Sequence, residues 1–219
     1  LDFLTLFSQV SMGFRPPQMT ELYRLQKKQI VGDIDSEKLV MLEIGSRFLT
    51  EYFEGSLSLY SGKKRDSIFR DAENFIQDHG KTNHKGLELF VKLEINETNS
   101  LFLAGTFQNH KYDFSSETSM KEKINKGNYV DTSPRTSFNL RWINLFSSNM
   151  KSEIEIERMG AYYTDAANLH KYEGHTLIHS RFVYLYRDNL TQFIRVHNLL
   201  DEDYAERADF NAFGGDRYF

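Results

Sequence analysis

Cysteine is missing from this chain, and proline is rare, with 3 among 219 residues. Without cysteine there can be no disulfide framework, thiolate metal site or cysteine nucleophile. The 27 basic and 31 acidic side chains nearly balance, so the net charge of −4 gives no electrostatic basis for binding nucleic acid. No apolar run approaches the roughly 18 residues of a membrane-spanning helix. The lack of such a run excludes a spanning α-helix, but not a spanning β-barrel, whose strands are only half apolar.

Aromatic residues are abundant, at 14% of the chain. They suit pleated, half-buried surfaces, and scarce proline suits long uninterrupted strands. Apolar and polar residues also alternate with a period of two, most clearly over residues 87–94, 137–142 and 153–157. A helix would scatter both kinds of residue around its axis. The sequence therefore predicts an all-β chain.

The connections between these alternating segments fall into two kinds. Short polar turns are expected near 51–54, 96–99, 147–149 and 187–189. Longer segments are expected at 13–38, 70–83, 112–134, 164–174 and from 200 onward. Strict alternation of the two kinds predicts an antiparallel up-and-down transmembrane β-barrel segment of about nine long strands, with short turns at one rim and long loops at the other. The alternative is a soluble β-sandwich or a β-solenoid, although no fixed short repeat is found.

Five local motifs give the chain a family resemblance. In chain order they are GFRPPQ with TELY (13–23), SEKL with EIG (36–45), NHKGLEL (83–89), GAYYTD with YEGHT (160–176) and NLLDEDYA (198–205). They resemble, in the same order, motifs of the TonB-dependent receptors, including the NLLDxxYA signature near the C-terminus. Each motif alone is weak, but together they extend from Gly13 to Ala205.

The resemblance implies a ligand-gated transporter in the outer membrane of a Gram-negative bacterium. Such barrels have about 22 strands around a plugged lumen. We therefore expect residues 1–219 to be a fragment of the barrel domain that lacks the plug domain and the closing strand. The implied partners are the TonB system acting through the missing plug, outer-membrane lipid and lipopolysaccharide, and a small-molecule ligand of the iron-chelate or siderophore class. A passive outer-membrane pore and a soluble β-rich binding module are the alternatives.

In such a barrel the polar strand faces point inward, toward the plug and the lumen. They would carry Glu43, Arg47, Glu88, Lys92, Arg141, Glu153, Glu155, Glu157, Arg181 and Arg195. The functional interpretation is plug docking or a substrate path, and the alternative is a solvated interior whose charges pair with one another. The glutamates at 153, 155 and 157 could hold a cation, but we expect arginines on the adjacent strands to pair with them.

Ligand contact is expected in the long external loops. The candidates there are Arg15, Tyr23, Arg24, His79, Tyr162, Tyr163, His170, Tyr172 and Arg207. Arginine and tyrosine suit anionic, aromatic chelates through charge-assisted hydrogen bonds and stacking, while tyrosines near a rim also suit an interfacial aromatic girdle.

Metal binding and catalysis have no support in the sequence. On a strand, His175 and His179 would lie about 13 Å apart, too far to share one zinc ion. No nucleophile elbow, P-loop or paired-carboxylate motif is present. We expect no resident metal, no cofactor and no enzyme activity.

Overall fold

The computed structural model describes residues 3–23, 34–73, 75–187, 190–205, 208–211 and 215–218. Within them, nine strands form one antiparallel sheet in the order β1-β2-β3-β4-β5-β8-β9-β12-β13. The strands are β1 (Leu4–Arg15), β2 (Glu37–Leu49), β3 (Phe53–Arg70), β4 (Ile76–Asn96), β5 (Asn99–Tyr112), β8 (Thr136–Ser147), β9 (Met150–Met159), β12 (His175–Arg187) and β13 (Leu190–Val196). The predicted all-β, up-and-down architecture is confirmed. The sheet does not close on itself, and β1 and β13 are its edges.

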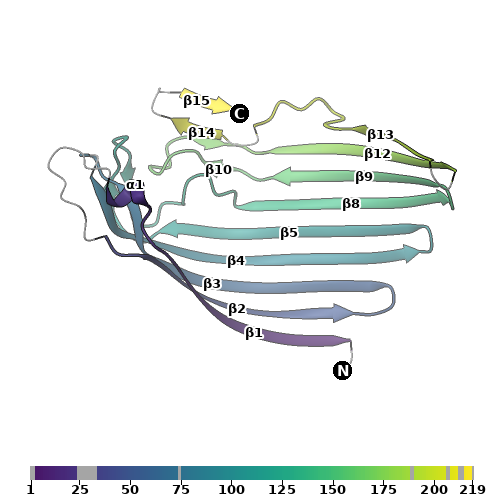
Figure 1. The fold of residues 1–219 in the computed structure, drawn as a ribbon, viewed down its shortest axis with the longest axis horizontal. Helices are drawn as coiled ribbons and strands as arrows, with labels where there is room; N and C mark the ends of the chain where they lie inside the picture. Colours follow the sequence, from purple (N-terminus) through teal and green to yellow (C-terminus); the bar gives the residue numbers. More distant parts are fainter. Residues whose placement is uncertain are drawn as a thin grey trace.

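The short elements gather at one end of the sheet. Figure 1 shows the tight turns at the right of the view and the short elements at the left and top. These elements are α1 (Met19–Leu22) and the hairpin strands β6 (Ser116–Glu117), β7 (Lys123–Ile124), β10 (Tyr162–Tyr163), β11 (Lys171–Tyr172), β14 (Ala208–Asn211) and β15 (Gly215–Tyr218). In the described part of the chain, no helix is both long enough and apolar enough to cross a membrane.

One of the predicted loops is wrong. The segment 70–83 is mostly strand, because β3 continues to Arg70 and β4 already begins at Ile76. A tight turn joins them, in which the carboxylate of Asp71 accepts hydrogen bonds from the backbone N–H groups of Glu73 (3.0 Å) and Phe75 (2.9 Å). His79 therefore lies on a strand and not in a loop. The long segments 112–134 and from 200 onward each include a short hairpin outside the main sheet, β6–β7 and β14–β15 respectively.

The sheet has almost no conventional core. Large apolar side chains remain exposed along it, with Leu42 50% exposed, Leu59 48% and Trp142 41%. Buried aromatic residues occur instead at the loop end, where Tyr162 and Tyr172 pack with Ala205. The sheet is therefore held together chiefly by its backbone hydrogen bonds and cross-strand pairs.

Gly86 supplies a close contact that a side chain would block. It lies directly across from Tyr60, whose ring occupies the space that a Cβ at position 86 would take. The Tyr60 hydroxyl is hydrogen-bonded to Nε2 of His110, 3.1 Å away on β5. Gly105 is a matched control on a neighbouring strand, because a Cβ there would meet its nearest neighbour, Phe138 Cβ, at an ordinary 3.4 Å.

We therefore predict that Gly86→Ala destabilises the complete protein by about 1–3 kcal/mol, because the Tyr60 ring must move. Gly105→Ala should be neutral or slightly stabilising, since it only restricts the unfolded chain. Thermal unfolding in detergent, followed by the shift in gel migration on heating, measures both. Equal stability of the two variants would contradict the close packing of Tyr60 on Gly86.

Candidate functional site

The charged residues predicted to point inward share one face of the sheet. Directly paired residues of an antiparallel sheet lie on the same face, as do residues two apart along a strand. Arg47 on β2 pairs with Ser56, which in turn pairs with Phe90 on β4. Further direct pairs, through β5 and β8, lead from Phe90 to Glu157 on β9, so these residues lie on the same face. The same register places every predicted inward residue on this charged face: Glu43, Arg47, Glu88, Lys92, Arg141, Glu153, Glu155, Glu157, Arg181 and Arg195. That the charged face borders a lumen stays a prediction.

The glutamates of β9 pair with side chains from the neighbouring strands. Glu153 lies 3.6 Å from Nη1 of Arg141, and Glu157 lies 3.7 Å from Nε2 of His179. Glu155 accepts a hydrogen bond of 2.8 Å from Asn139. Among the described residues, no group of three or more His, Asp or Glu side chains is placed to hold a metal ion.

A groove of about 300 Å³ runs along this part of the charged face, lined by β8, β9, β12 and β13. Arg181 and Arg195 lie directly opposite each other within it. The charges are thus interleaved across strands, an arrangement suited to hydrogen bonding with a polar surface or solvent and unsuited to apolar packing.

Phe102 and Phe193 are aromatic rings on the charged face that are covered by cations. Phe102 disrupts the alternation of β5 in the sequence, and the structure accounts for it. The guanidinium of Arg141 lies 5.4 Å and the ammonium of Lys92 lies 5.9 Å from the centre of its ring. Arg181 covers Phe193 in the same way at 5.6 Å. Cation–π attraction makes these apolar side chains compatible with a polar face.

A carboxylate cluster ties the loop ends of β1, β2 and β3 together. Glu37 accepts hydrogen bonds from Nε of Arg15 (2.7 Å) and from the backbone N–H of Ile68 (2.9 Å), and Nζ of Lys64 lies 2.9 Å away. Arg15 also pairs with Glu21 of α1 at 3.0 Å. Burial alone would raise the pKa of Glu37, but the hydrogen bonds from Arg15, Ile68 and Lys64 outweigh it and lower this pKa to about 2.

Two of the predicted ligand residues, Tyr162 and Tyr172, are buried. The ring centres of Tyr162 and Tyr172 are 5.4 Å apart. The Tyr172 hydroxyl is 2.7 Å from Nδ1 of His175 and accepts a hydrogen bond of 3.1 Å from the backbone N–H of Ala205. These contacts attach the segment before β14 to the start of β12. A direct ligand contact by these two residues stays a prediction.

The other loop candidates are more accessible. Tyr23 is 56% exposed just after α1. His79 is exposed on β4, with its ring 5.1 Å from that of Phe69. His170 is half-buried, with Nδ1 3.5 Å from the carboxylate of Asp165.

Tyr163 is half-buried and stacks on Tyr129, with ring centres 6.0 Å apart. Arg24 and Arg207 lie outside the described residues.

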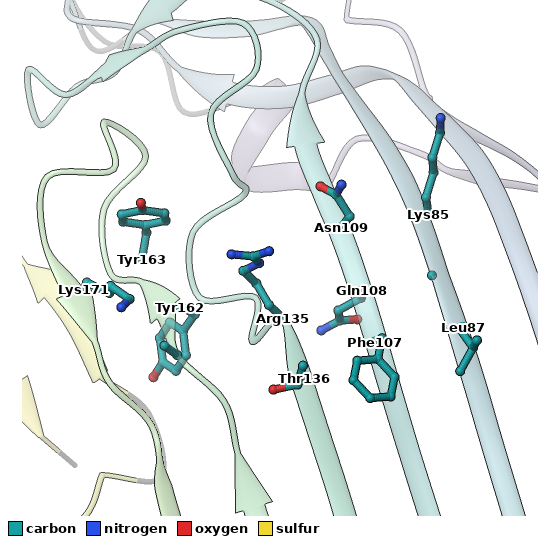
Figure 2. A pocket seen from close by; sticks show the side chains of 12 residues that line it. Lys85, Leu87, Phe107, Gln108, Asn109, Arg135, Thr136, Tyr162, Tyr163 and Lys171 are labelled. Atoms are coloured by element: carbon teal, nitrogen blue, oxygen red, sulfur yellow. The ribbon is translucent and has the colours of Figure 1, made fainter.

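A larger pocket, of about 570 Å³, is lined by two of the predicted ligand residues, Tyr162 and Tyr163, together with residues that the sequence did not single out. Figure 2 shows Arg135 between the tyrosines of β10 and Asn109 on β5, with Lys171 and Lys85 on opposite sides. Leu87 and Phe107 contribute apolar side chains to the same pocket. It forms from segments far apart in the chain, and only the change from Leu87 to Lys85 along one face of β4 signals it in the sequence.

Comparison with known proteins identifies relatives of this fold. A family profile described as "TonB dependent receptor-like, beta-barrel" matches residues 1–199. No curated protein sequence matches the chain. Among solved structures, the unliganded ferric citrate transporter FecA has a TM-score of 0.81 at 17% identity, over 100% of this chain and 34% of that chain.

Two further solved structures are similar. The ferric yersiniabactin uptake receptor FyuA from Yersinia pestis has a TM-score of 0.80 at 16% identity, over 99% of this chain and 33% of that chain. The copper transporter OprC has a TM-score of 0.74 at 16% identity, over 94% of this chain and 32% of that chain. The chain spans about a third of the length of these structures.

The lowered pKa of Glu37 predicts a pH dependence of stability. Because the folded state holds this carboxylate ionised below the ordinary pKa of 4.5, its contribution is complete above pH 4.5 and is lost as pH falls toward 2. At neutral pH, Glu37→Gln should cost about 1–3 kcal/mol in the complete protein, with most of this difference from wild type lost at pH 2. Thermal unfolding as a function of pH measures this difference.

Glu173→Gln is the control, because Glu173 pairs with Lys171 at 2.9 Å but is 77% exposed. If the difference in the free energy of unfolding between wild type and E37Q did not change with pH, the stabilising role of this carboxylate cluster would be contradicted.

Proposed function

This chain belongs to the TonB-dependent receptor β-barrel family, and on that premise we propose that residues 1–219 form part of the barrel wall of a TonB-dependent outer-membrane transporter. The family and the similar solved structures are receptors and transporters, not enzymes. The observation that carries the proposal is the division of the long sheet into a charged face and an apolar face. Its open edges at β1 and β13 call for further strands, because unpaired backbone groups are not tolerated in lipid.

The apolar face is suited to contact with lipid. On β4 it presents alternating apolar residues from Leu87 to Leu93, which pair with Leu57 and Leu59 on β3 and with Leu101 and Leu103 on β5. Six residue steps at about 3.3 Å give about 20 Å of apolar strand, which at a strand tilt of about 40° spans about 15 Å of the ~25 Å apolar band of outer-membrane barrels. An exposed apolar surface of this extent is unusual for a protein in water.

The charged face is suited to line the lumen. In the proposed barrel it would contact the plug domain, through which TonB transmits energy, and the path that a released ligand follows. The exposed cations Arg181 and Arg195 of β12 and β13 are available to acidic groups of that domain. The short turns would then lie on the periplasmic side and the long loops outside the cell.

We propose an iron chelate as the ligand. FecA and FyuA are named for ferric citrate and ferric yersiniabactin, whereas OprC, with the same fold, is a copper transporter. Tyr23 and His79 are exposed at the loop end, where such a chelate would arrive. The loop candidates Arg15, Arg24, Tyr163, His170 and Arg207 belong to the same proposal.

Adjacent residues of β5 test the two-faced wall. Leu103 belongs to the apolar face and Ala104 to the charged face. In the complete receptor, Leu103→Arg should destabilise the membrane-inserted barrel by about 2–4 kcal/mol, while Ala104→Arg should be tolerated. Recovery of folded protein in the outer-membrane fraction and its heat-dependent gel migration measure both. If Ala104→Arg were the more damaging change, the proposed orientation would be inverted.

Uptake assays test the transport proposal. In a strain that carries the complete receptor, accumulation of radiolabelled iron supplied as ferric chelates should require both the receptor and TonB. Uptake that requires the receptor but continues without TonB would indicate a passive pore. Failure of the receptor to bind any ferric chelate, with folding intact, would contradict the ligand class alone.

A further inference from the structure

Two histidines face each other on neighbouring strands at the loop end of the charged face. His84 on β4 is paired directly with His110 on β5, and it lies an even number of residues from Glu88, so both side chains belong to the charged face. The centres of the two rings are 4.5 Å apart, and the ring planes are tilted by 64°. The pair lies on the loop side of Leu87, beyond the apolar residues of β4.

The separation of these rings matches that of two imidazoles bound to one metal ion. A ring nitrogen binds Zn²⁺ at about 2.0–2.1 Å, which places the ion about 3.2 Å from the ring centre. Two such rings, at a bond angle of about 90–110°, have centres about 4.5–5.2 Å apart. His84 and His110, at 4.5 Å, can therefore share an ion through rotation of their side chains alone.

A hydroxyl from a third strand reaches the pair. The hydroxyl of Tyr60 on β3 lies 3.1 Å from Nε2 of His110. The Tyr60 ring crosses β4 over Gly86, where no side chain obstructs it. Figure 1 shows β3, β4 and β5 side by side in the sheet. Two imidazole nitrogens and one phenol oxygen are thus available from three adjacent strands, and water would complete a tetrahedral shell.

Hydroxyl groups hold one nitrogen of each ring. Oγ1 of Thr82 lies 2.7 Å from Nε2 of His84, and Oγ of Ser133 lies 3.2 Å from Nδ1 of His110. Histidines that ligate a metal ion typically have their second nitrogen hydrogen-bonded in this way, which fixes the ring. The nitrogens that remain for an ion are Nδ1 of His84 and Nε2 of His110, which faces Tyr60.

The surroundings of the pair admit a cation. His84 lines two cavities, of about 370 Å³ and about 420 Å³, through which an ion can reach it. Glu43 is paired directly with Tyr60 on the same face. Lys64, which lies on the loop side, is already paired with Glu37 at 2.9 Å. A nearby carboxylate and a neutralised lysine favour a cation at this position.

A second pair of histidines on the charged face is less suited to a metal ion. The ring centres of His179 and His197 are 5.2 Å apart, and Glu157 lies 3.7 Å from Nε2 of His179. In the part of the chain that the structure describes, however, Glu157 is not placed to complete a metal site with these two histidines. This pair therefore serves as a matched control.

We propose that His84, His110 and Tyr60 bind a divalent transition-metal ion, Zn²⁺ or Cu²⁺. Imidazole nitrogen suits these ions, whereas Mg²⁺ and Ca²⁺ prefer oxygen ligands. The bound ion links β3, β4 and β5 and stabilises this end of the sheet, because it binds only the folded chain. The sequence did not indicate the site, because its members lie on different strands. The site does not require an iron chelate, so it goes beyond the proposed function.

Metal titration of the complete, untagged receptor in detergent tests the proposal. After treatment with a chelator, isothermal titration with Zn²⁺ or Cu²⁺ measures binding in the absence of any ferric chelate. Wild type should bind one ion more than the variant His84→Gln, His110→Gln, and Tyr60→Phe should bind that ion about ten-fold more weakly. In the electron paramagnetic resonance spectrum of bound Cu²⁺, coupling to two imidazole nitrogens should be present in wild type and absent from the double variant.

The variant His179→Gln, His197→Gln should bind like wild type. Unchanged binding by the His84 and His110 variant, loss of the ion from the control variant instead, or equal binding of Mg²⁺ by wild type would each overturn the proposal. Outer-membrane recovery and heat-dependent gel migration show whether each variant is folded. If the double variant does not fold, Tyr60→Phe carries the test, because it keeps the ring over Gly86, and an unchanged affinity and Cu²⁺ spectrum there would overturn the proposed site.

Discussion

The structure depends on the hydrogen-bonded ladder of a sheet whose side chains alternate between two different surroundings. Each strand of the ladder presents every second residue to one face, so one strand can carry Leu89 and Val91 on the apolar face and Glu88 and Lys92 on the charged face. A shift of register by one residue would exchange the two sets. This sensitivity explains why the register stays unbroken through the middle of the sheet and shifts only near its ends, as between Lys64 and Ser67.

The strand ladder and the loop end of the sheet are stabilised by different interactions. Along the ladder, exposed ion pairs contribute little individually, and cation–π contacts such as Arg141 on Phe102 mainly make the charged face self-consistent. At the loop end, buried groups determine the conformation. Glu37 joins three strands through Arg15, Lys64 and the Ile68 backbone, and Tyr172 joins the segment that ends at Ala205 to β12. The loop end is therefore the part of the chain in which single polar substitutions should have large effects.

The sequence predicted the ladder well and the loop end poorly, for one physical reason. Within the apolar band the two faces differ in polarity, so period-two alternation is visible in the sequence. Beyond Lys85 both faces are polar, and residues such as Thr82 and His84 form strand without any alternation to indicate it. Residue type also cannot tell a tyrosine that binds ligand from one that is buried, as Tyr172 is. Of the pocket in Figure 2, the sequence pointed to Tyr162 and Tyr163 but not to Lys85, Arg135 and Lys171, because these come together only in the folded chain.

The central claim is that one face of the sheet meets lipid and the other meets water. Because the chain has no cysteine, single cysteines can be placed at successive positions 87–94 of β4 without background labelling from this region. Each would carry an environment-sensitive fluorophore in the complete receptor reconstituted into vesicles. We predict that lipid-borne quenchers act on labels at 87, 89, 91 and 93 and that water-soluble quenchers act on labels at the even positions. Quenching from water at every position, or lipid quenching at the even positions, would contradict it.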